Sequence, residues 1–325
     1  MNPARKTRKR TIACIITVVL AAILLGSAFY MQWYALQAQG NARGKDLQGS
    51  YTFMFQRYPH IKAWHDSLQT AKALRDTFIT SEDQIRLHAF YIPSDSSTSK
   101  TAVVIHGYTD NAIRMLHIAY LYHHDLHYNV FLPELRYSGL SDGSHIQMAW
   151  LDRTDIINWL KIANQIFAPN DSTDTQMVIH GISMGAATTM CTSGETLPDY
   201  VNCMVEDCGY TSVWDEYKGQ LKEQFHLSAF PLLYLTSWLT DLRYGWNFKE
   251  ASPLEQIKKS KYPMLFIHGD KDTFVPTWMG DSLYAIYRGP KTYWRVPGAE
   301  HAESYLKYPK EYTEKVRKFT LEYNH

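Results

Sequence analysis

The stretch VIHGISMGAAT, residues 178–188, limits the possible folds of this chain more than any other part of the sequence. Ser183 stands between Gly181 and Gly185, after a run of β-branched and apolar residues and before small residues typical of a helix start. A very tight strand-to-helix turn can push a serine out of the edge of a sheet, and it brings the residues two before and two after against each other. Only glycine-sized side chains fit there, so the spacing predicts an elbow that exposes the Ser183 hydroxyl.

The rest of the chain supplies the strands and helices that such a turn requires. From about residue 76, short β-branched runs alternate with amphipathic stretches, which predicts an α/β fold with a mostly parallel, eight-stranded sheet flanked by helices. We expect strands at 76–80, 84–92, 101–106, 128–133, 175–181, 200–206, 262–268 and 291–296. We expect helices near 112–126, 149–167, 184–194, 277–287 and 303–322. The first two strands, joined by TSEDQ, should form an antiparallel hairpin.

One insertion interrupts this alternation at about residues 212–255, between the sixth and seventh strands. It contains FHLSAFPLLYLTSWLTDLRYGWNF and is too long for an ordinary loop, so we expect two or three apolar helices that form a cap over the sheet edge. Its large apolar side chains are Phe225, Phe230, Leu232, Leu233, Trp238, Leu239 and Trp246. They either line an apolar pocket under the cap or form the cap's own core.

The N-terminus has the features of a transmembrane signal anchor. Residues 1–10 contain five basic residues and no acid, and residues 11–31 hold no charge over a length that spans a bilayer core of about 30 Å. Trp33 and Tyr34 follow, and both side-chain types favour the membrane interface. The positive end predicts a basic cytoplasmic tail at 1–10, a stalk and lead-in helices at 32–75, and a folded domain at 76–325 outside the cytoplasm.

Two other interpretations of the N-terminus compete with the anchor. The small residues Gly26-Ser27-Ala28 resemble a signal-peptide cleavage site, in which case the domain is secreted. A buried helix of a soluble protein is the other, and the flanking charge argues against it. Beyond the basic tail the chain carries 28 basic and 32 acidic residues, so its body offers no face for nucleic acid.

Two loops late in the chain carry the partners that a reactive Ser183 needs. A serine hydroxyl becomes a good nucleophile when a histidine takes its proton and a carboxylate orients that histidine. FIHGDKDTFVP places Asp270 and Asp272 after one strand, and VPGAEHAESY places His301 after the next. Both loops open at the carboxyl ends of strands, the edge at which α/β sheets bind ligands. We therefore expect Ser183, His301 and one aspartate to meet there.

Two backbone N–H groups are candidates for an oxyanion hole, which stabilises the negative oxygen of an acyl-transfer intermediate. One belongs to Met184, at a helix start whose dipole adds positive charge. The other belongs to Tyr108 in IHGYTDN, the loop after the third strand, where Gly107 lets the backbone turn its amides inward. The alternative is that Gly107 serves only a tight turn.

The remaining histidines and the cysteines have simpler interpretations. Three histidines precede a glycine at a strand end, where a packed or hydrogen-bonded imidazole is usual: His106, His180 and His268. The histidines of YHHDLHY, residues 122–128, suit a solvated helix end better than a metal site. The cysteines outside the apolar segment are expected to be small buried thiols: Cys191, Cys203 and Cys208. We predict neither a metal nor a cofactor.

Taken together, these motifs resemble the α/β-hydrolase superfamily, and within it the serine esterase, acylglycerol lipase and serine aminopeptidase-like branch with its membrane-anchored bacterial members. The motifs HGYTDN, ELRYSGLSDG, GISMG, HGDKDTFVP and GAEHAES occur in that family's order over residues 75–320. The resemblance implies Asp272 as the acid, with Asp270 nearby and Asp207 a distant alternative. Tyr137 and Ser138 depart from the family's usual glycine or histidine, which concerns that loop's contact with the elbow and not the triad.

The function expected from this set is a serine hydrolase that cleaves carboxylic esters with apolar acyl or aryl groups through an acyl-enzyme. Its partners would be a small-molecule ester and, through the N-terminal helix, the membrane. Serine aminopeptidase-like, thioesterase or acyltransferase activity is the alternative, since these reactions share the same covalent intermediate. A catalytically silent binding protein with a hydrolase fold is the other.

Overall fold

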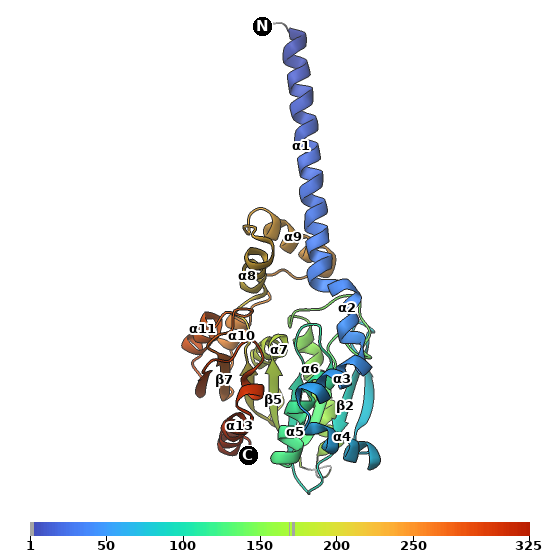
Figure 1. Cartoon of the computed structure of the whole chain (residues 1–325), viewed down its shortest axis with the longest axis vertical. Coiled ribbons are helices and arrows are strands. Elements are labelled where there is room, and N and C mark those ends of the chain that lie inside the picture. The colour runs from blue at the N-terminus through green and yellow to red at the C-terminus, as the bar shows by residue number, and fades with distance from the viewer. Residues whose placement is uncertain (1–2, 169, 171–172) are drawn as a thin grey trace.

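An eight-stranded sheet forms the middle layer of the domain in this computed structural model, which describes residues 3–168, 170 and 173–325 (Figure 1). The strands are β1 (Arg75–Thr80), β2 (Arg86–Ile92), β3 (Lys100–Ile105), β4 (Asn129–Pro133), β5 (Gln176–Ile182), β6 (Val201–Asp207), β7 (Met264–Gly269) and β8 (Lys291–Val296). Their order across the sheet is β1-β2-β4-β3-β5-β6-β7-β8. Because β2 is antiparallel to β1 and β4 and all other neighbours are parallel, the predicted fold class is confirmed.

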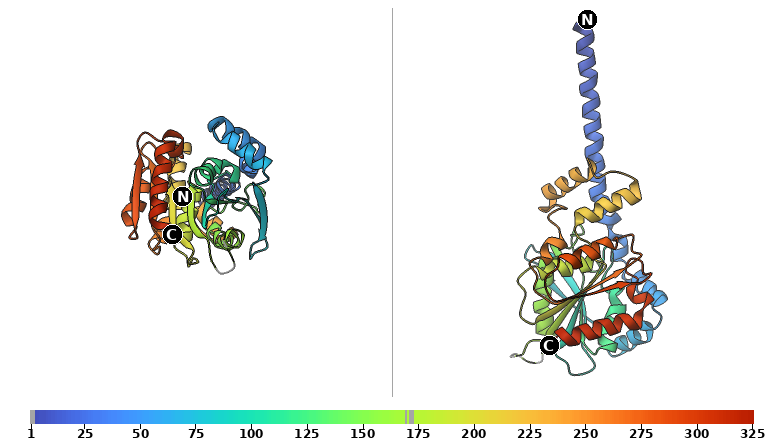
Figure 2. Two further views of the ribbon diagram at one scale, coloured as in Figure 1. Left: turned by 90° about the horizontal axis from the view of Figure 1, so that it is seen from below. Right: turned by 90° about the vertical axis from the view of Figure 1, so that its left-hand side faces the viewer.

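Helices cover both faces of the sheet (Figure 2). One apolar core contains Val103 and Ile105 of β3 and is covered by α6 (Asp152–Phe167), α7 (Met184–Ser193), α10 (Pro253–Ile257) and α11 (Trp278–Ile286). The other contains Ala102 and Val104 and is covered by α3 (Leu47–Arg57), α4 (Ile61–Thr70), α5 (Leu116–Tyr120), α12 (Ser304–Lys307) and α13 (Pro309–Tyr323). Alternate residues of a strand face opposite sides of the sheet, so the central strands are buried on both faces.

Two of the expected helices are interrupted. The segment at 112–126 consists of a 3₁₀ turn (Ala112–Met115), α5 and a π-helical turn (Leu121–Asp125), and the Asn111 side chain caps the first turn by accepting from the backbone N–H groups of Ile113 and Arg114. The segment at 303–322 breaks between α12 and α13 at Pro309. Proline lacks the N–H that would continue α12, and it instead occupies the first position of α13.

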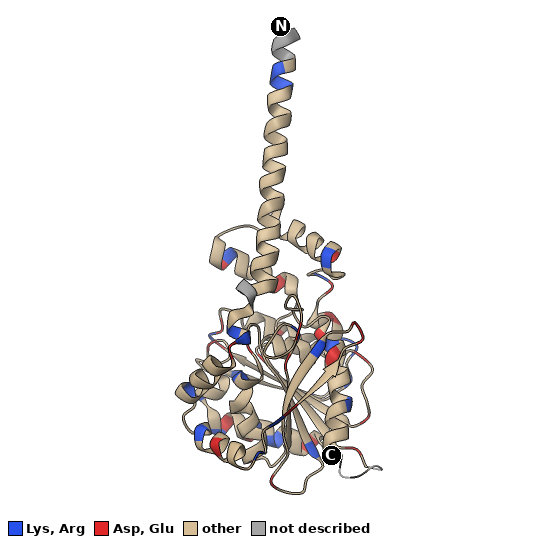
Figure 3. Ribbon diagram, turned by 90° about the vertical axis from the view of Figure 1, so that its right-hand side faces the viewer, with Lys and Arg blue, Asp and Glu red and all other residues tan. Residues whose placement is uncertain are grey.

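A long helix, α1 (Pro3–Gln32), projects from the domain and continues through a π-helical segment (Trp33–Gln37) into α2 (Ala38–Lys45) (Figure 1). Residues 1–2 of the predicted basic tail lie outside the described residues. Within the described part of the chain, this helix alone is long and apolar enough to cross a membrane, and beyond the basic residues near its N-terminal end no charged residue lies along residues 11–31 (Figure 3). The lead-in helices α3 and α4 pack against the sheet domain through Met54, Tyr58 and Ile61.

The insertion forms three helices: α8 (Val213–Phe225), α9 (Leu232–Tyr244) and the short α10. Helices α8 and α9, which we call the cap (residues 213–244), lie beside the lower part of α1 (Figures 1 and 2). The helices α9 and α1 pack directly against each other. The cap therefore covers the domain at the end from which α1 emerges.

The elbow at residues 181–185 is held by close contacts between backbones. A Cβ atom on Gly181 would lie 2.0 Å from the Gly185 carbonyl oxygen, and one on Gly185 would lie 2.1 Å from the carbonyl oxygen of Ile105 in β3. Ser183 has φ 57° and ψ −118°, a conformation that residues with a side chain rarely adopt. The turn therefore raises Ser183 above the sheet only because its neighbours have no side chains.

Gly185→Ala is expected to destabilise the protein by at least about 2 kcal/mol, because the new methyl group meets backbone that cannot move aside as a side chain could. The matched control is Gly219→Ala, since a Cβ there meets nothing within 4 Å. Gly219 lies inside α8, where alanine should instead stabilise by about 0.5–1 kcal/mol. Thermal unfolding of both variants in the same detergent checks this, and a Gly185→Ala protein as stable as wild type would contradict it.

Candidate active site

Three side chains form a hydrogen-bonded chain at the carboxyl edge of the sheet. Ser183 Oγ is 2.9 Å from His301 Nε2, and His301 Nδ1 is 2.7 Å from Asp272 Oδ2. Ser183 follows β5, Asp272 follows β7 and His301 follows β8, so the parallel strands deliver all three residues to one edge. With Nδ1–H donating to the carboxylate, Nε2 is free to accept the serine proton.

The Asp272 carboxylate is fixed by its own loop. Its Oδ1 accepts the backbone N–H groups of Phe274 at 3.0 Å and Val275 at 2.9 Å, which leaves Oδ2 for His301. The carboxylate is fully buried, whereas the imidazole of His301 is partly open to solvent. The ring of Phe274 lies 4.9 Å from that imidazole, so the same loop orients the carboxylate and covers the imidazole.

The two other candidate acids have different partners. Asp270 Oδ1 accepts the backbone N–H of Gly298 at 2.6 Å and so closes the loop before His301. Asp207 accepts the hydroxyl groups of Ser304 at 3.2 Å and Tyr312 at 3.0 Å, and burial raises its pKa to about 7. None of these three hydrogen bonds involves the His301 imidazole, so the geometry favours Asp272 as its partner.

The loop after β3 lies directly beside the serine. A Cβ atom on Gly107 would lie 3.5 Å from Ser183 Cβ, which is an ordinary van der Waals distance, so the loop lies against the elbow without requiring a glycine at this position. Tyr108 and Met184 both line the same pocket as Ser183. The Tyr108 hydroxyl donates to the carbonyl oxygen of Ala35 at 2.7 Å, which ties this loop to the segment that follows α1.

The three histidines at strand ends are buried and hydrogen-bonded, and the three cysteines of the domain are buried. His106 Nε2 accepts the backbone N–H of Leu135 at 3.0 Å. His180 lies between the Tyr122 and Tyr312 hydroxyls, and His268 Nε2 donates to the Val275 carbonyl. The expectation of buried free thiols is confirmed for Cys191, Cys203 and Cys208.

One group of potential metal ligands occurs among the described residues, and it shares Asp272 and His301 with the hydrogen-bonded chain of Ser183. Atoms of Cys208, Asp272 and His301 lie within 4.8 Å of one another. Burial raises the pKa of the Cys208 thiol well above its ordinary value, which keeps it protonated and a poor ligand. The facing atoms of Asp272 and His301 are already bonded to each other, so the donor set suits a triad better than a cation.

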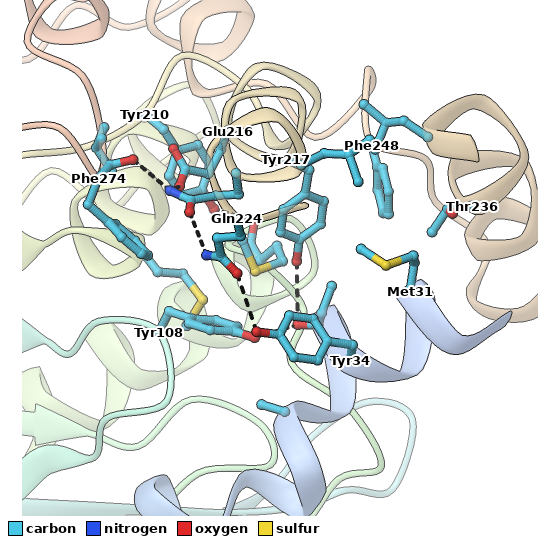
Figure 4. Close-up of a pocket in the computed structure, with 18 of the residues that line it drawn as sticks. Met31, Tyr34, Tyr108, Tyr210, Glu216, Tyr217, Gln224, Thr236, Phe248 and Phe274 are labelled. Atoms are coloured by element: carbon cyan, nitrogen blue, oxygen red, sulfur yellow. Dashed lines mark hydrogen bonds between the residues drawn. The ribbon is translucent and has the colours of Figure 1, made fainter. Parts of the chain in front are cut away.

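A cavity of about 290 Å³ opens beside Ser183 under the cap (Figure 4). Its apolar walls come from the cap and the domain, including Met148, Leu221, Leu232, Leu233 and Phe248. The seven apolar side chains of the insertion divide into three groups. Phe225, Leu232 and Leu233 line the cavity, Leu239 and Trp246 are buried in the core, and Phe230 and Trp238 are exposed. Both interpretations of the insertion therefore hold, each for some residues.

One wall of this cavity is polar, which the sequence analysis did not anticipate. Glu216, Gln220 and Gln224 follow one another at four-residue spacing on α8 and are joined by hydrogen bonds of 2.9 and 2.7 Å (Figure 4). Gln220 also donates to the Phe274 carbonyl, and the Tyr34 hydroxyl donates to Gln224. This row connects the loop of Asp272 to the segment that follows α1.

The N-terminal segment forms another wall that the sequence did not reveal. Met31, Tyr34, Ala35 and Ala38 line the cavity although they precede Ser183 by about 150 residues (Figure 4). The only signal in the sequence was the aromatic border after the apolar run. That border suggests a membrane interface and says nothing about a pocket.

Glu216 is the titratable group that sequence reasoning missed. It lies on the cavity wall, and its Oε2 is buried with no hydrogen-bond partner among the described residues. Burial is the main cause that raises its pKa to about 7. A carboxyl group in this setting favours the protonated form, which can donate a hydrogen bond into the cavity.

Comparisons with known proteins agree with the fold. A sequence profile of the prolyl oligopeptidase family matches residues 149–323. The uncharacterized protein YqkD of Bacillus subtilis is 29% identical over 252 residues, which cover 74% of this chain and 81% of that protein. The α/β hydrolase domain-containing protein WAV2 of Arabidopsis thaliana is 26% identical over 71% of this chain and 73% of its own.

Solved structures extend the likeness. An esterase from Pyrococcus furiosus superimposes with a TM-score of 0.62 at 21% identity, covering 78% of this chain and 92% of that chain. An acylaminoacyl peptidase from Pyrococcus horikoshii gives a TM-score of 0.55 at 18% identity, covering 75% of this chain and 41% of that chain. These structures confirm the α/β-hydrolase fold, and the family and sequence matches support the resemblance to that superfamily.

Asp272→Asn is expected to lower kcat about 10⁴-fold while the protein stays folded, because an amide can hold His301 in the wrong tautomer. Asp270→Asn is the matched control, since Asp270 bonds only to the loop backbone in this geometry and should keep most of the activity. Steady-state hydrolysis of a chromogenic ester measures both. Equal losses in the two variants would contradict the assignment of the acid.

Glu216→Gln is expected to change how stability depends on pH. The folded state raises the pKa of Glu216 from 4.5 to about 7, so its contribution is present below pH 4.5 and is lost as pH rises through 7. Relative to wild type, the variant should gain up to about 3 kcal/mol of stability between pH 5 and pH 8. Denaturant unfolding at both pH values checks this. Asp207 titrates in both proteins, so its contribution cancels in the difference between their free energies of unfolding. A difference that does not change with pH would refute the expectation.

Proposed function

The chain belongs to the prolyl oligopeptidase family, and we propose that it is a membrane-anchored serine hydrolase that cleaves carboxylic esters with an apolar acyl or aryl group. The observation that carries this proposal is the unbroken chain from Ser183 Oγ through His301 to Asp272, with distances of 2.9 and 2.7 Å. The oxyanion hole is assigned to the backbone N–H groups of Tyr108 and Met184. Gly181 and Gly185 hold the elbow.

The reaction follows from the positions of these groups. Ser183 Oγ attacks the carbonyl carbon of the ester while His301 Nε2 takes the serine proton. The N–H groups of Tyr108 and Met184 hold the oxyanion, and His301 then gives its proton to the departing alcohol. Water attacks the acyl-enzyme with His301 again as the base, which releases the acid and restores Ser183. Asp272 stabilises the imidazolium throughout.

The shape and lining of the cavity support an ester substrate. An apolar acyl group fits the walls formed by Leu221, Leu232, Leu233 and Phe248, which begin directly beside Ser183. The polar row from Glu216 to Gln224 lies along one side only, and it can bind a carbonyl, hydroxyl or amine of the substrate. An aminopeptidase-like activity is the second candidate, and the family match favours it. A thioesterase or acyltransferase would differ in leaving group or acceptor.

The packing of α1 supports an anchor that is retained. Ala28 and Gln32 are buried against the rest of the protein, and Gln32 Nε2 donates to Thr240 Oγ1 of α9 at 3.0 Å. Cleavage near Ala28 would remove the helix that packs on the cap and leave that side of the cavity unsupported. The basic N-terminal end favours an orientation with the domain outside the cytoplasm.

Labelling with a fluorophosphonate probe tests the proposal on the full-length protein in detergent. We expect labelling of the wild type and its loss in Ser183→Ala. Hydrolysis of p-nitrophenyl esters of increasing chain length, beside aminoacyl anilides, then defines the substrate. Leu233→Trp should fill the cavity and lower kcat/KM for long-chain esters while sparing acetate. A folded protein that is not labelled by the probe would refute the proposal that this chain is a serine hydrolase. Faster cleavage of anilides than of esters would favour the aminopeptidase-like activity.

A further inference from the structure

The outer face of α9 exposes a row of large apolar side chains. Tyr234, Trp238 and Leu242 follow at four-residue spacing, which places them on one side of the helix, and they are 49%, 55% and 68% exposed. Phe230, in the turn directly before α9, is 73% exposed. Leu227, in the turn before α9, adds to the row at 47%. Such a contiguous apolar row on a soluble surface indicates a contact with something apolar.

The opposite face of α9 packs on α1 (Figure 1). Thr236 and Thr240 of α9 are buried, as is Ala28 of α1, and small residues of this kind let two helices approach closely. The contact is fixed at its lower end by Gln32, which donates to Thr240 at 3.0 Å and accepts from Arg243 Nη1 at 2.5 Å. The cap is therefore attached to α1 itself and not only to the domain below it.

The position of this contact along α1 places α9 at the depth of lipid. On α1, the positions turned toward the protein are Leu24, Ser27, Ala28 and Met31, which belong to the uncharged run 11–31. The part of that run above the contact, residues 11–23, is about 20 Å long at 1.5 Å per residue. A bilayer core is about 30 Å thick, so α1 can span it only if the level occupied by α9 also lies within the membrane.

We propose that the outer face of α9, from Leu227 to Leu242, is inserted in the leaflet that faces the domain, beside the anchor helix. The partner is the lipid bilayer, and the row of aromatic and aliphatic side chains has the composition of an interfacial helix. The exposed apolar row of α9 lies beside the exposed apolar side chains of α1, and exposing both surfaces to water would be unfavourable. The continuity of the two surfaces favours lipid over a second protein.

The surface bears on the substrate, and this step rests on the proposed function. Leu232, Leu233 and Thr236 of α9 line the cavity, as do Met31 and Tyr34 of the α1 segment. In this proposal the outer side of α9 faces lipid, and its inner side, with Thr236, faces the cavity (Figure 4). The esters that suit this arrangement are amphiphiles that reside in the membrane and pass their acyl chain into the cavity between α9 and α1.

Spin labels on the full-length protein in lipid nanodiscs test the insertion. The background is Cys14→Ser, because the other three cysteines are buried. Labels are placed through Trp238→Cys on α9, Val18→Cys on the exposed side of α1, and Lys318→Cys on α13 at the far side of the domain. We expect the labels at 238 and 18 to be relaxed by oxygen, which concentrates in lipid, and to be shielded from an aqueous nickel chelate. The label at 318 should be relaxed by the nickel chelate and less by oxygen.

Each other outcome overturns the proposal. A label at 238 that resembles the one at 318, while the one at 18 lies in lipid, would show an anchored protein whose cap stays in water. If the label at 238 is shielded from both oxygen and the nickel chelate, and its spectrum is broadened by dipolar coupling to another label, a second copy of the chain covers α9. If the labels at 18 and 238 are both accessible to the nickel chelate, neither α1 nor α9 lies in lipid, and the proposal that α1 is a membrane anchor is refuted as well.

An activity measurement separates this inference from the proposed function. Trp238→Asp should lose most of its activity on a long-chain ester embedded in phosphatidylcholine vesicles and keep its activity on water-soluble p-nitrophenyl acetate, since Trp238 lies outside the cavity lining. Equal activity of variant and wild type on both substrates would contradict delivery from the membrane. A wild-type protein that hydrolyses neither ester would refute the proposed esterase activity, whereas the spin labels would still decide whether α9 is inserted in lipid.

Discussion

The close approach of three backbone segments at the elbow is the constraint on which the site depends. Gly181 contacts the Gly185 carbonyl, and Gly185 contacts the Ile105 carbonyl of β3, at distances that exclude any Cβ atom. These contacts hold Ser183 in its strained conformation and bring the loop after β3 against it. The same packing fixes the start of α7, so the hydroxyl, a helix dipole and the candidate oxyanion donors share one position. Because the contacts are between backbones, no side-chain rearrangement can relieve them.

A second level of organisation joins the triad to the N-terminal helix. The loop of Asp272 contacts Gln220, the row on α8 continues to Gln224, and the Tyr34 hydroxyl completes it. The Tyr108 hydroxyl reaches Ala35 from the other side of the cavity. The segment that follows the apolar helix is thus bonded to both loops beside Ser183. The long apolar helix is therefore more than an appendage of the domain, because its continuation is a wall of the cavity.

The cavity combines apolar walls with a buried, titratable carboxyl group. Apolar walls favour an acyl chain, whereas the buried carboxyl of Glu216 is tolerated only when it is protonated or meets a donor. Family membership alone does not decide between esters and peptides, since solved neighbours with the same fold include an esterase and a peptidase. The lining of the site therefore carries more information about the substrate than the fold does.

What the sequence determined by itself was local or periodic: the order of strands and helices, the glycine spacing around Ser183, the loops that carry Asp272 and His301, and the apolar run of α1. These features follow from steric limits on a few adjacent residues and from hydrophobic periodicity, which can be seen in a linear chain. The tertiary structure alone decided that Phe230 and Trp238 face outward and that Tyr34 and Glu216 border the cavity. Those outcomes depend on how helices far apart in sequence pack together, and no spacing along one chain encodes that geometry.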